Sequence, residues 1–260
     1  MVCIKQVPGV TGEELEIKRD SSGIETEDLE MDISEWDNYA IEAAIRLKES
    51  HGGKVTVVTL GDEDSEDVLR QALAMGADNA ILIDAQGFEG SDAAGIAKGL
   101  YAAVKPLSFD LLLTGVQSSD EGWGQVGGIL AELLEVPSAA LVVGIESGDK
   151  TLTVLRELEN NTLEKVKLPF PAVLTVQTGI NDPRYVSIMG IQKAKEIEIT
   201  ETDASDLGIK LEEIGLKGSG IASRVLSLPV VGDGAEFLEG SIDEICDKIG
   251  KIIKDKAGMV

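Results

Sequence analysis

Histidine, cysteine and aromatic side chains are scarce in this chain. Its 260 residues include one histidine, His51, and two cysteines, Cys3 and Cys246, and aromatic residues make up only 3%. A single histidine argues against Ser-His-Asp or Cys-His catalysis and against a histidine-based metal site. The cysteines are far apart and follow neither metal-ligand spacing nor a disulfide framework, which is typical of a reducing compartment. We therefore expect no metal site and no catalytic group of these kinds.

Positive charge and long apolar runs are also limited. Lysine and arginine total 23 against 47 aspartate and glutamate residues, which gives a net charge of −24. Nucleic acids and anionic membranes need a basic surface, so neither is an expected partner. No apolar run approaches the length of about 18 residues that a membrane span needs, and the start MVCIKQVPG turns polar too soon for a secretory signal. We expect a cytoplasmic protein without membrane insertion, whose acidity suits either a basic partner surface or solubility.

The chain is rich in small and branched apolar residues, arranged as short runs that alternate with amphipathic segments. This pattern predicts strands at 1–7, 54–60, 80–83 and 109–113 and helices at 34–50, 62–75, 91–104 and 126–134. At the start of the first helix, Ser34 and Asp37 resemble a capping box. Alternating strands and helices predict a doubly wound parallel sheet, with the first strand central and the fourth on its own side. Ligand is then expected between the ends of strands one and four.

The stretch 109–131, FDLLLTGVQSSDEGWGQVGGILA, is the centre of the expected site. It runs from an apolar strand through a glycine-rich turn into a helix. Backbone N–H groups at a helix start attract phosphate, and glycines let the anion come close. The stretch matches neither GxGxxG nor a Walker loop. An ordinary turn in which Ser119 or Asp120 caps the helix is therefore the alternative interpretation.

The second half of the chain has a different pattern. Short extended runs at 139–145, 152–158, 163–168 and 172–176 predict antiparallel strands added to the sheet. From residue 200 the chain is polar and contains many glycines, which suggests an extended arm. The arm ends in a helix that Ser241 and Glu244 cap, with an apolar stripe of Ile242, Ile245, Cys246, Ile249, Ile252 and Ile253. We expect a core over 1–199 and an arm over 200–260 that packs on another chain, with packing on the main domain as the alternative.

Four segments, in order, resemble the beta subunit of electron transfer flavoproteins. They are VCIKQVP at the start, EWDNYAIEAAIRLKE with LRQALAMGAD, the loop QSSDEGWGQVGG, and PFPAVLTVQTGINDPRYVSIMGIQKAKEIEI. The resemblance covers about residues 1–200. It implies an α/β domain of the adenine-nucleotide-binding type, an alpha-subunit partner that holds a redox-active FAD, and an arm that wraps onto that partner. It also implies a heterodimeric electron carrier that serves dehydrogenases, often of the acyl-CoA type, with no catalysis by this chain alone.

The resemblance further implies a nucleotide site in this chain. The backbone N–H groups of 122–128 would hold phosphate, and the Gln125 side chain would donate a hydrogen bond. Cys3 would lie under the base or ribose, and Asp120 would cap the helix or bind a ribose hydroxyl. The implied site residues are Cys3, Ser34, Glu35, Trp36, Asp37, Leu60, Asp120, Gly122, Trp123, Gly124, Gln125, Val126, Gly127 and Gly128.

The occupant of that site is open between two nucleotides. Ordinary members bury AMP, whereas electron-bifurcating members, which oxidise NADH, hold a second FAD and show D-G-D-T-A-Q-V-G. This chain has D-E-G-W-G-Q-V-G, so Trp123 replaces a small residue. An indole there would stack on adenine and fill space that an isoalloxazine needs, although it could also fold back on the surface. We expect AMP, with a second FAD as the alternative; a non-redox adenine-nucleotide sensor is a third interpretation.

Two more positions are implied for contacts outside the nucleotide site. Glu157 matches a family glutamate that helps to set the mobility of the FAD domain, or is simply an exposed strand carboxylate. Ile188, flanked by Tyr185 and Met189, matches the apolar anchor that docks into a dehydrogenase. The alternative for Ile188 is an inward side chain that closes a turn.

Overall fold

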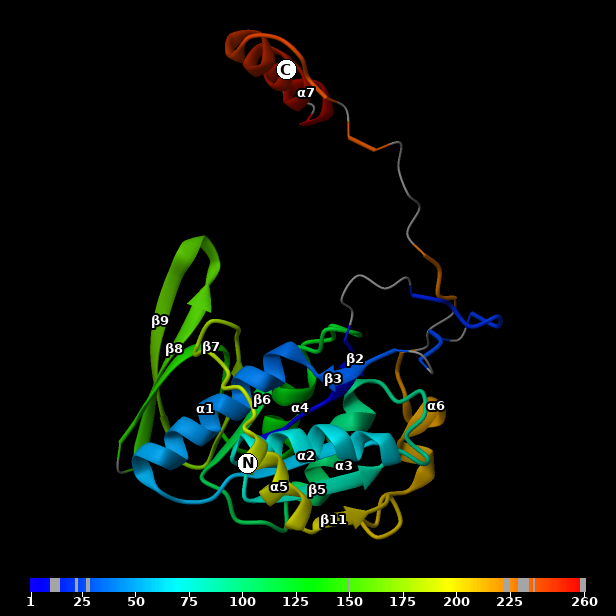
Figure 1. Ribbon diagram of the computed structural model, residues 1–260, viewed down its shortest axis with the longest axis vertical. Helices are drawn as coiled ribbons and strands as arrows, with labels where there is room; N and C mark the ends of the chain where they lie inside the picture. Colours follow the sequence, from blue (N-terminus) through cyan, green and yellow to red (C-terminus); the bar gives the residue numbers. More distant parts are fainter. Residues whose placement is uncertain are drawn as a thin grey trace.

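The chain alternates strands and helices around one large sheet (Figure 1). The computed structural model describes residues 1–9, 15–21, 23–26, 29–148, 150–221, 225–228, 234–235 and 237–257. The strands of the large sheet are β1 (Val2–Cys3), β4 (Thr56–Gly61), β5 (Asn79–Asp84), β6 (Leu111–Gly115), β7 (Ser138–Ser147), β8 (Thr151–Leu158), β9 (Thr162–Pro169), β10 (Ala172–Val176) and β11 (Ile199–Thr202), while β2 (Gln6–Pro8) and β3 (Met31–Ile33) form a small antiparallel sheet. The helices are α1 (Glu35–His51), α2 (Glu66–Met75), α3 (Ala93–Val104), α4 (Val126–Leu133), α5 (Ile188–Glu196), α6 (Gly215–Gly218) and α7 (Ile242–Ala257), with short 3₁₀ turns η1 (Glu63–Ser65), η2 (Glu159–Asn161) and η3 (Leu211–Glu213).

The large sheet confirms the predicted doubly wound fold. Its strand order is β11-β5-β4-β1-β6-β10-β7-β8-β9, and every pair from β11 to β7 is parallel. Strand β1 pairs with β4 on one side and with β6 on the other. The connections therefore reverse direction between β1 and β6, where the sequence predicts the ligand crevice.

The prediction that the later strands are antiparallel is wrong for β10 and holds on one side of β7, which is antiparallel to β8 and parallel to β10. Strand β10 lies between β6 and β7 and is parallel to both. Its five residues, Ala172–Val176, are all buried, as expected of an interior parallel strand with helices over both faces. Only β8 and β9 are antiparallel additions. They form a hairpin that extends beyond the body of the chain (Figure 1) and turns at Asn160 and Asn161, both with positive φ.

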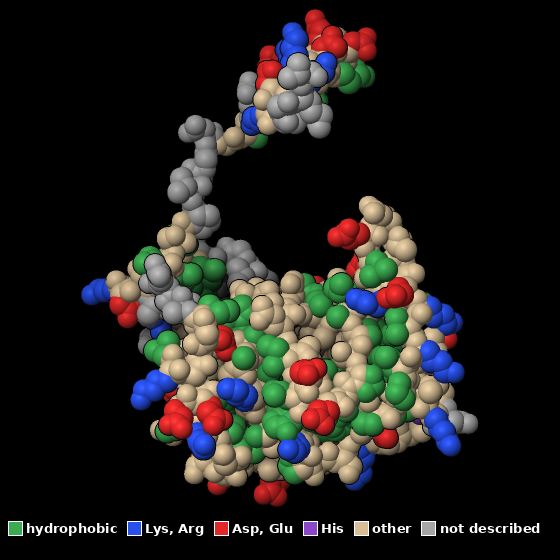
Figure 2. Space-filling view, turned by 180° about the vertical axis from the view of Figure 1, so that it is seen from behind, with side chains coloured by type: hydrophobic (Ala, Val, Ile, Leu, Met, Phe, Trp, Pro, Cys, Tyr) green, Lys and Arg blue, Asp and Glu red, His purple; other side chains and the backbone are tan. Residues whose placement is uncertain are grey.

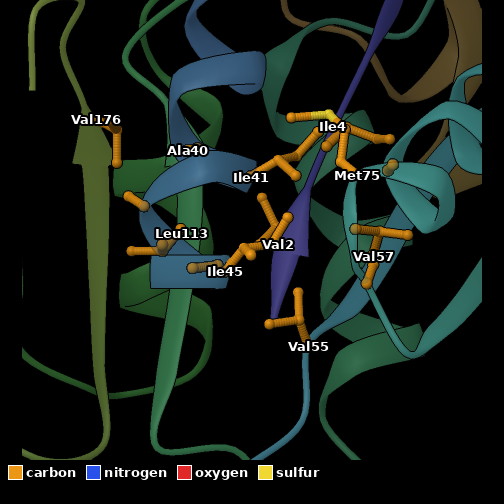
Figure 3. Close-up of a cluster of buried hydrophobic side chains, with 14 of the residues drawn as sticks. Val2, Ile4, Ala40, Ile41, Ile45, Val55, Val57, Met75, Leu113 and Val176 are labelled. Atoms are coloured by element: carbon orange, nitrogen blue, oxygen red, sulfur yellow. The ribbon is translucent and has the colours of Figure 1, made fainter. Parts of the chain in front are cut away.

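Side chains that alternate along the central strands create two separate cores. Val2 and Ile4 pack with Ile41 of α1 and Met75 of α2 in one core (Figure 3). Cys3, between them, packs on the opposite face with side chains of α3 and α4. This period of two places one helical layer on each side of the sheet. Because aromatic residues are few, both cores consist mainly of aliphatic side chains.

The segment after β11 stays attached to the sheet for some distance. Strand β11 pairs with β5 at the sheet edge, and Ala204 and Ile214 are buried in the second core. The backbone N–H of Gly215 donates to Ser91 Oγ at 2.7 Å, and that of Gly220 donates to Asp92 Oδ2 at 2.7 Å. The division into a core and an arm at residue 200 stays a prediction. Parts of the expected arm, at 222–224, 229–233, 236 and 258–260, lie outside the described residues.

Helix α7 confirms the predicted terminal helix and its capping box. Ser241 N–H donates to Glu244 Oε2 at 2.8 Å, and Glu244 N–H donates to Ser241 Oγ at 3.4 Å. The helix lies apart from the sheet in Figure 1 and in the opposite view of Figure 2. Its stripe is uncovered, since Ile242 is 80% and Ile253 54% exposed. Among the described residues, no helix is long and apolar enough to cross a bilayer.

Candidate functional site: a cavity at the switch point of the sheet

A cavity of about 320 Å³ lies at the ends of β1, β4 and β6. This is the place where the sequence predicts that a ligand binds. One wall comes from the loop between β5 and α3, including Glu89, Gly90 and Ser91. The opposite wall comes from the loop between β6 and α4, including Gln117, Glu121 and Trp123. The two loops follow parallel strands on either side of β1, so both emerge at the same edge of the sheet.

Asp37 fixes the floor of this cavity. Its Oδ2 accepts the backbone N–H of Lys5 at 2.8 Å, and its Oδ1 accepts the backbone N–H of Gly115 at 2.7 Å. The side chain is buried, and burial raises the pKa of Asp37 to about 7 although both N–H donors favour the charged form. The predicted capping box of Ser34 with Asp37 is therefore wrong. Ser34 makes no side-chain cap, and its buried Oγ has no partner among the described residues.

Trp36 lies beside the cavity floor and connects it to Glu157. A Cβ on Gly115 would stand 2.6 Å from Trp36 Cβ, so only glycine allows α1 to approach β6 this closely. The indole N–H of Trp36 donates to Gln177 Oε1 at 2.9 Å, and Gln177 Nε2 donates to Glu157 Oε2 at 3.2 Å. Glu157 is half-buried on β8 and is thus linked through one amide to the start of α1.

The glycine-rich loop adopts a backbone that its sequence requires. Gly122 and Gly124 have φ of 61° and 63°, a left-handed conformation that glycine adopts at little cost. The N-cap position of α4 is Gln125, so the helix-capping interpretation of Asp120 is wrong. Asp120 Oδ1 instead accepts the N–H of Glu121 at 2.7 Å. Its other oxygen forms an ion pair with Lys5 Nζ at 2.7 Å.

The start of α4 supplies hydrogen-bond donors to one end of the cavity. Val126 and Gly127 line it, and no side chain caps the helix. A Cβ on Gly127 would lie 2.6 Å from Thr114 Oγ1 and 2.5 Å from Thr175 Cγ2, so glycine lets the helix start pack directly on β6 and β10. Uncapped first-turn N–H groups and the helix dipole favour an anion here. This end of the cavity suits a phosphate group.

The other end is apolar. Leu60, Phe88, Ile96 and Leu100 contribute to its lining together with Cys3. Cys3 is 5% exposed, and burial raises the pKa of its thiol to about 12. The thiol is therefore neutral at physiological pH and is a small apolar group on the cavity wall. An apolar slot with an anion-binding end fits a nucleoside phosphate.

Most, but not all, of the residues implied for the site line the cavity. Those that do are Cys3, Asp37, Leu60, Trp123, Gly124, Gln125, Val126 and Gly127. The others lie next to it, in the α1 start or the loop: Ser34, Glu35, Trp36, Asp120, Gly122 and Gly128. The sequence analysis missed Lys5 and the wall formed by Ala85, Glu89, Gly90 and Ser91. Lys5 lies two residues after β1, at the switch point of the sheet, and this position was the signal that could have identified it.

A second candidate functional surface surrounds the start of α5. Tyr185 is 100% exposed, Met189 81% and Ile188 78%, so the inward interpretation of Ile188 is wrong. We call residues 185–191 the docking segment. Ser187 caps α5 by accepting the N–H of Gly190 at 3.0 Å. A segment with so many exposed large apolar side chains is typical of a protein contact.

The docking segment is held at both ends by arginines. Before it, Arg184 pairs with the buried Glu42 at 2.7 Å and with Glu49 at 2.7 Å, both on α1. After it, Arg70 of α2 donates to the carbonyl oxygens of Ala194 and Ile197, at 2.7 and 2.5 Å. The apolar side chains are therefore presented on a fixed backbone, which reduces the entropy lost when a partner binds.

Comparison with known proteins agrees with this arrangement. The electron transfer flavoprotein domain family matches residues 22–207. The electron transfer flavoprotein subunit beta of Methylophilus methylotrophus is 35% identical over 99% of this chain and 98% of its own length. The protein of the same name from Bacillus subtilis is 37% identical over 91% of this chain and 93% of its own. A caffeyl-CoA reductase-Etf complex subunit, CarD of Acetobacterium woodii, is 33% identical over 98% of both chains.

These matches extend through the two cavity walls and the docking segment. The fold, the cavity at the switch point and the near-complete alignment lead to one conclusion. The chain belongs to the electron transfer flavoprotein family, as a beta subunit, and its work is electron transfer.

Proposed function

We propose that this chain is the structural half of a heterodimeric electron carrier, in which it holds AMP and an alpha subunit holds the redox-active FAD. The heterodimer takes electrons from a dehydrogenase, of the acyl-CoA type, and passes them to a downstream acceptor in the cytoplasm. The observation that carries this proposal is the cavity, which has an apolar slot and an anion-binding end, and in which the Cys3 thiol is buried and neutral. These features suit the binding of a nucleoside phosphate.

The size of the cavity supports AMP over FAD. At about 320 Å³ it is near the lower end of the range of small-molecule sites. Trp123 lines it, so the indole borders the space that an isoalloxazine would need. The flat indole face suits adenine stacking, and the start of α4 suits a single phosphate.

A second FAD is the alternative occupant, and it has some support. The loop ends in Gln125, Val126 and Gly127, as in the bifurcating pattern. The relative from Acetobacterium woodii is named as a subunit of a caffeyl-CoA reductase-Etf complex. With a second FAD the heterodimer would oxidise NADH and bifurcate electrons.

Two exposed surfaces support two protein partners. The apolar stripe of α7 needs a cover, and the arm that carries it would wrap onto the alpha subunit. The docking segment, with Ile188 at its centre and Tyr185 and Met189 beside it, would insert into a dehydrogenase. Glu157, linked through Gln177 to Trp36, would face the FAD domain of the alpha subunit and help to set its mobility.

The nucleotide content of the purified complex tests this proposal. The chain is co-produced with its alpha subunit, the bound nucleotides are released by denaturation, and chromatography with mass measurement identifies them. One FAD and one AMP per heterodimer is the expected result. Two FAD and no AMP would establish the bifurcating alternative. If the chain binds AMP but no flavin-bearing partner co-purifies with it, it would be a nucleotide sensor instead.

A further inference from the structure

The walls of the cavity carry mostly negative charge. Among the described residues that line it, Asp37, Glu89 and Glu121 are acidic and Lys5 is the one lysine or arginine. The whole chain has a net charge of −24. An anionic ligand that enters this cavity therefore meets repulsion at several points. The helix start of α4 offsets part of it, but the neutral backbone supplies no full positive charge.

The ammonium group of Lys5, which lines the cavity, is paired with two carboxylates. Its Nζ lies 2.7 Å from Asp120 Oδ2 and 2.7 Å from Glu121 Oε2, and 6.0 Å from the centroid of the Trp123 ring. The backbone N–H of the same residue is fixed by Asp37. Burial disfavours its charged form, but hydrogen bonds to the two carboxylates raise the pKa of Lys5, so the ammonium is charged at physiological pH. A fixed backbone with a flexible four-carbon side chain lets the charge move between nearby anions.

We propose that Lys5 is the specificity-determining cation of the cavity, which makes it bind a nucleoside monophosphate in preference to the uncharged nucleoside. This inference rests on the proposed nucleotide function. Asp120 and Glu121 hold the Lys5 ammonium in the absence of ligand and compete with the phosphate for it. Two opposite effects follow. Removing the Lys5 charge weakens binding of the monophosphate, and removing the Glu121 charge strengthens it, while the nucleoside is affected by neither.

Calorimetric titration of AMP and of adenosine into the nucleotide-depleted heterodimer tests this. A charge-assisted hydrogen bond contributes enough for about a tenfold or larger change in affinity. We expect Lys5→Met to weaken AMP binding by about that factor and to change adenosine binding less than about twofold. Lys5→Arg should restore most of the AMP affinity, and Glu121→Gln should raise it several-fold. Lys195→Met, which removes one positive charge from the exposed face of α5, is the matched control and should change neither ligand.

The comparison of the two ligands separates the possible outcomes. An equal loss of affinity for AMP and for adenosine in Lys5→Met would mean that Lys5 only supports the cavity wall. That result would overturn the inference. Unchanged AMP binding in both Lys5→Met and Glu121→Gln would overturn it as well. If Lys5→Met fails to fold, the sign of the Glu121→Gln effect still decides. An unmodified heterodimer that binds neither ligand would overturn the nucleotide function itself.

Discussion

Asp37 and Gly115 are joined by a 2.7 Å hydrogen bond across the point where the connections of the sheet reverse direction. The other oxygen of the same carboxylate accepts the N–H of Lys5, which follows β1. One buried side chain at the start of α1 thus accepts hydrogen bonds from two backbone N–H groups, one after β1 and one at the end of β6, that need an acceptor where the sheet ends. It also holds the segments that follow β1 and β6 together beside the cavity that it lines.

Replacement of Asp37 by asparagine should destabilise the protein. Asparagine has the same shape but only one acceptor oxygen, so one of the two N–H groups would face an NH₂ group. A buried donor left without an acceptor costs about 1–3 kcal/mol. We expect the free energy of unfolding of Asp37→Asn at pH 7 to fall by that amount, measured by denaturant unfolding of the complex. Asp67→Asn, at an exposed position of α2, is the matched control. An unchanged unfolding curve for Asp37→Asn would show that the two hydrogen bonds of Asp37 contribute little to stability.

The raised pKa of Asp37 predicts a pH dependence of stability. Its pKa is about 7 in the folded state and about 4 in the unfolded state. Between these values the folded protein binds more protons than the unfolded chain, so the free energy of unfolding should fall as the pH rises from about 4 to 7. The slope from this group is at most about 1.4 kcal/mol per pH unit. Denaturant unfolding at several pH values should show that the free energy of unfolding falls less steeply with pH in Asp37→Asn than in the unmodified protein. The same pH dependence in both proteins would show that Asp37 does not have a raised pKa.

The central sheet could be predicted from the sequence because it depends on local patterns. Short β-branched runs that alternate with amphipathic segments specify parallel strands, and the crossover rules then place β1 between β4 and β6. The later strands could not be placed in this way. Strand β10 has the same short apolar run in a parallel or an antiparallel setting, and its insertion between β6 and β7 depends on packing with distant residues.

The candidate site likewise has residues that local sequence patterns reveal and residues that only the fold reveals. Cys3, Trp123 and Gly127 were implied by segments that resemble a family, and they line the cavity. Lys5 was not, because its role depends on Asp120 and Glu121, which lie far along the chain. The capping role given to Asp37 failed for the same reason, since its real partners are backbone groups on other elements. Local sequence reveals glycine turns and helix ends, whereas ion pairs between elements require the fold.

Truncation of Ile188 should weaken docking to the dehydrogenase. The side chain is 78% exposed at the centre of the docking segment and touches no part of the cavity. Loss of a buried apolar anchor at a contact costs about 2–3 kcal/mol. We expect Ile188→Ala to raise by at least about tenfold the dehydrogenase concentration that gives half-maximal flavin reduction, with unchanged flavin and AMP content. Leu107→Ala, an exposed leucine outside the docking segment, is the control, and an unchanged concentration curve for Ile188→Ala would remove it from this role.

The stripe of α7 should bind the alpha subunit. Ile249 and Ile253 lie on it and are 43% and 54% exposed in the chain alone. We expect Ile249→Asp with Ile253→Asp to abolish co-purification of the alpha subunit, because two buried carboxylates in an apolar contact are too costly. Lys251→Asp, on the polar face of the same helix, should retain it. The unmodified chain produced alone should self-associate on size-exclusion chromatography; a compact monomer with a protease-resistant C-terminus would count against an obligate partner.

Trp123 should decide between AMP and a second flavin. Gly122 and Gly124, on either side of it, both have positive φ, which glycine adopts readily, and the indole between them lines the cavity. There it offers a flat face to adenine and limits the room for a larger ring system. We expect Trp123→Thr to lower the amount of AMP retained per heterodimer during purification, because the stacking surface is lost.

The second tryptophan provides the matched control for this test. Trp36 lies beside the cavity but does not line it, and its indole N–H is bonded to Gln177. Trp36→Phe should therefore keep the AMP content of the unmodified complex, while Trp123→Thr loses AMP and has space to admit additional flavin. Equal AMP retention in both variants would show that Trp123 does not contact the base. Two FAD per heterodimer in the unmodified complex would mean that the indole leaves room for an isoalloxazine, and the function would then be electron bifurcation.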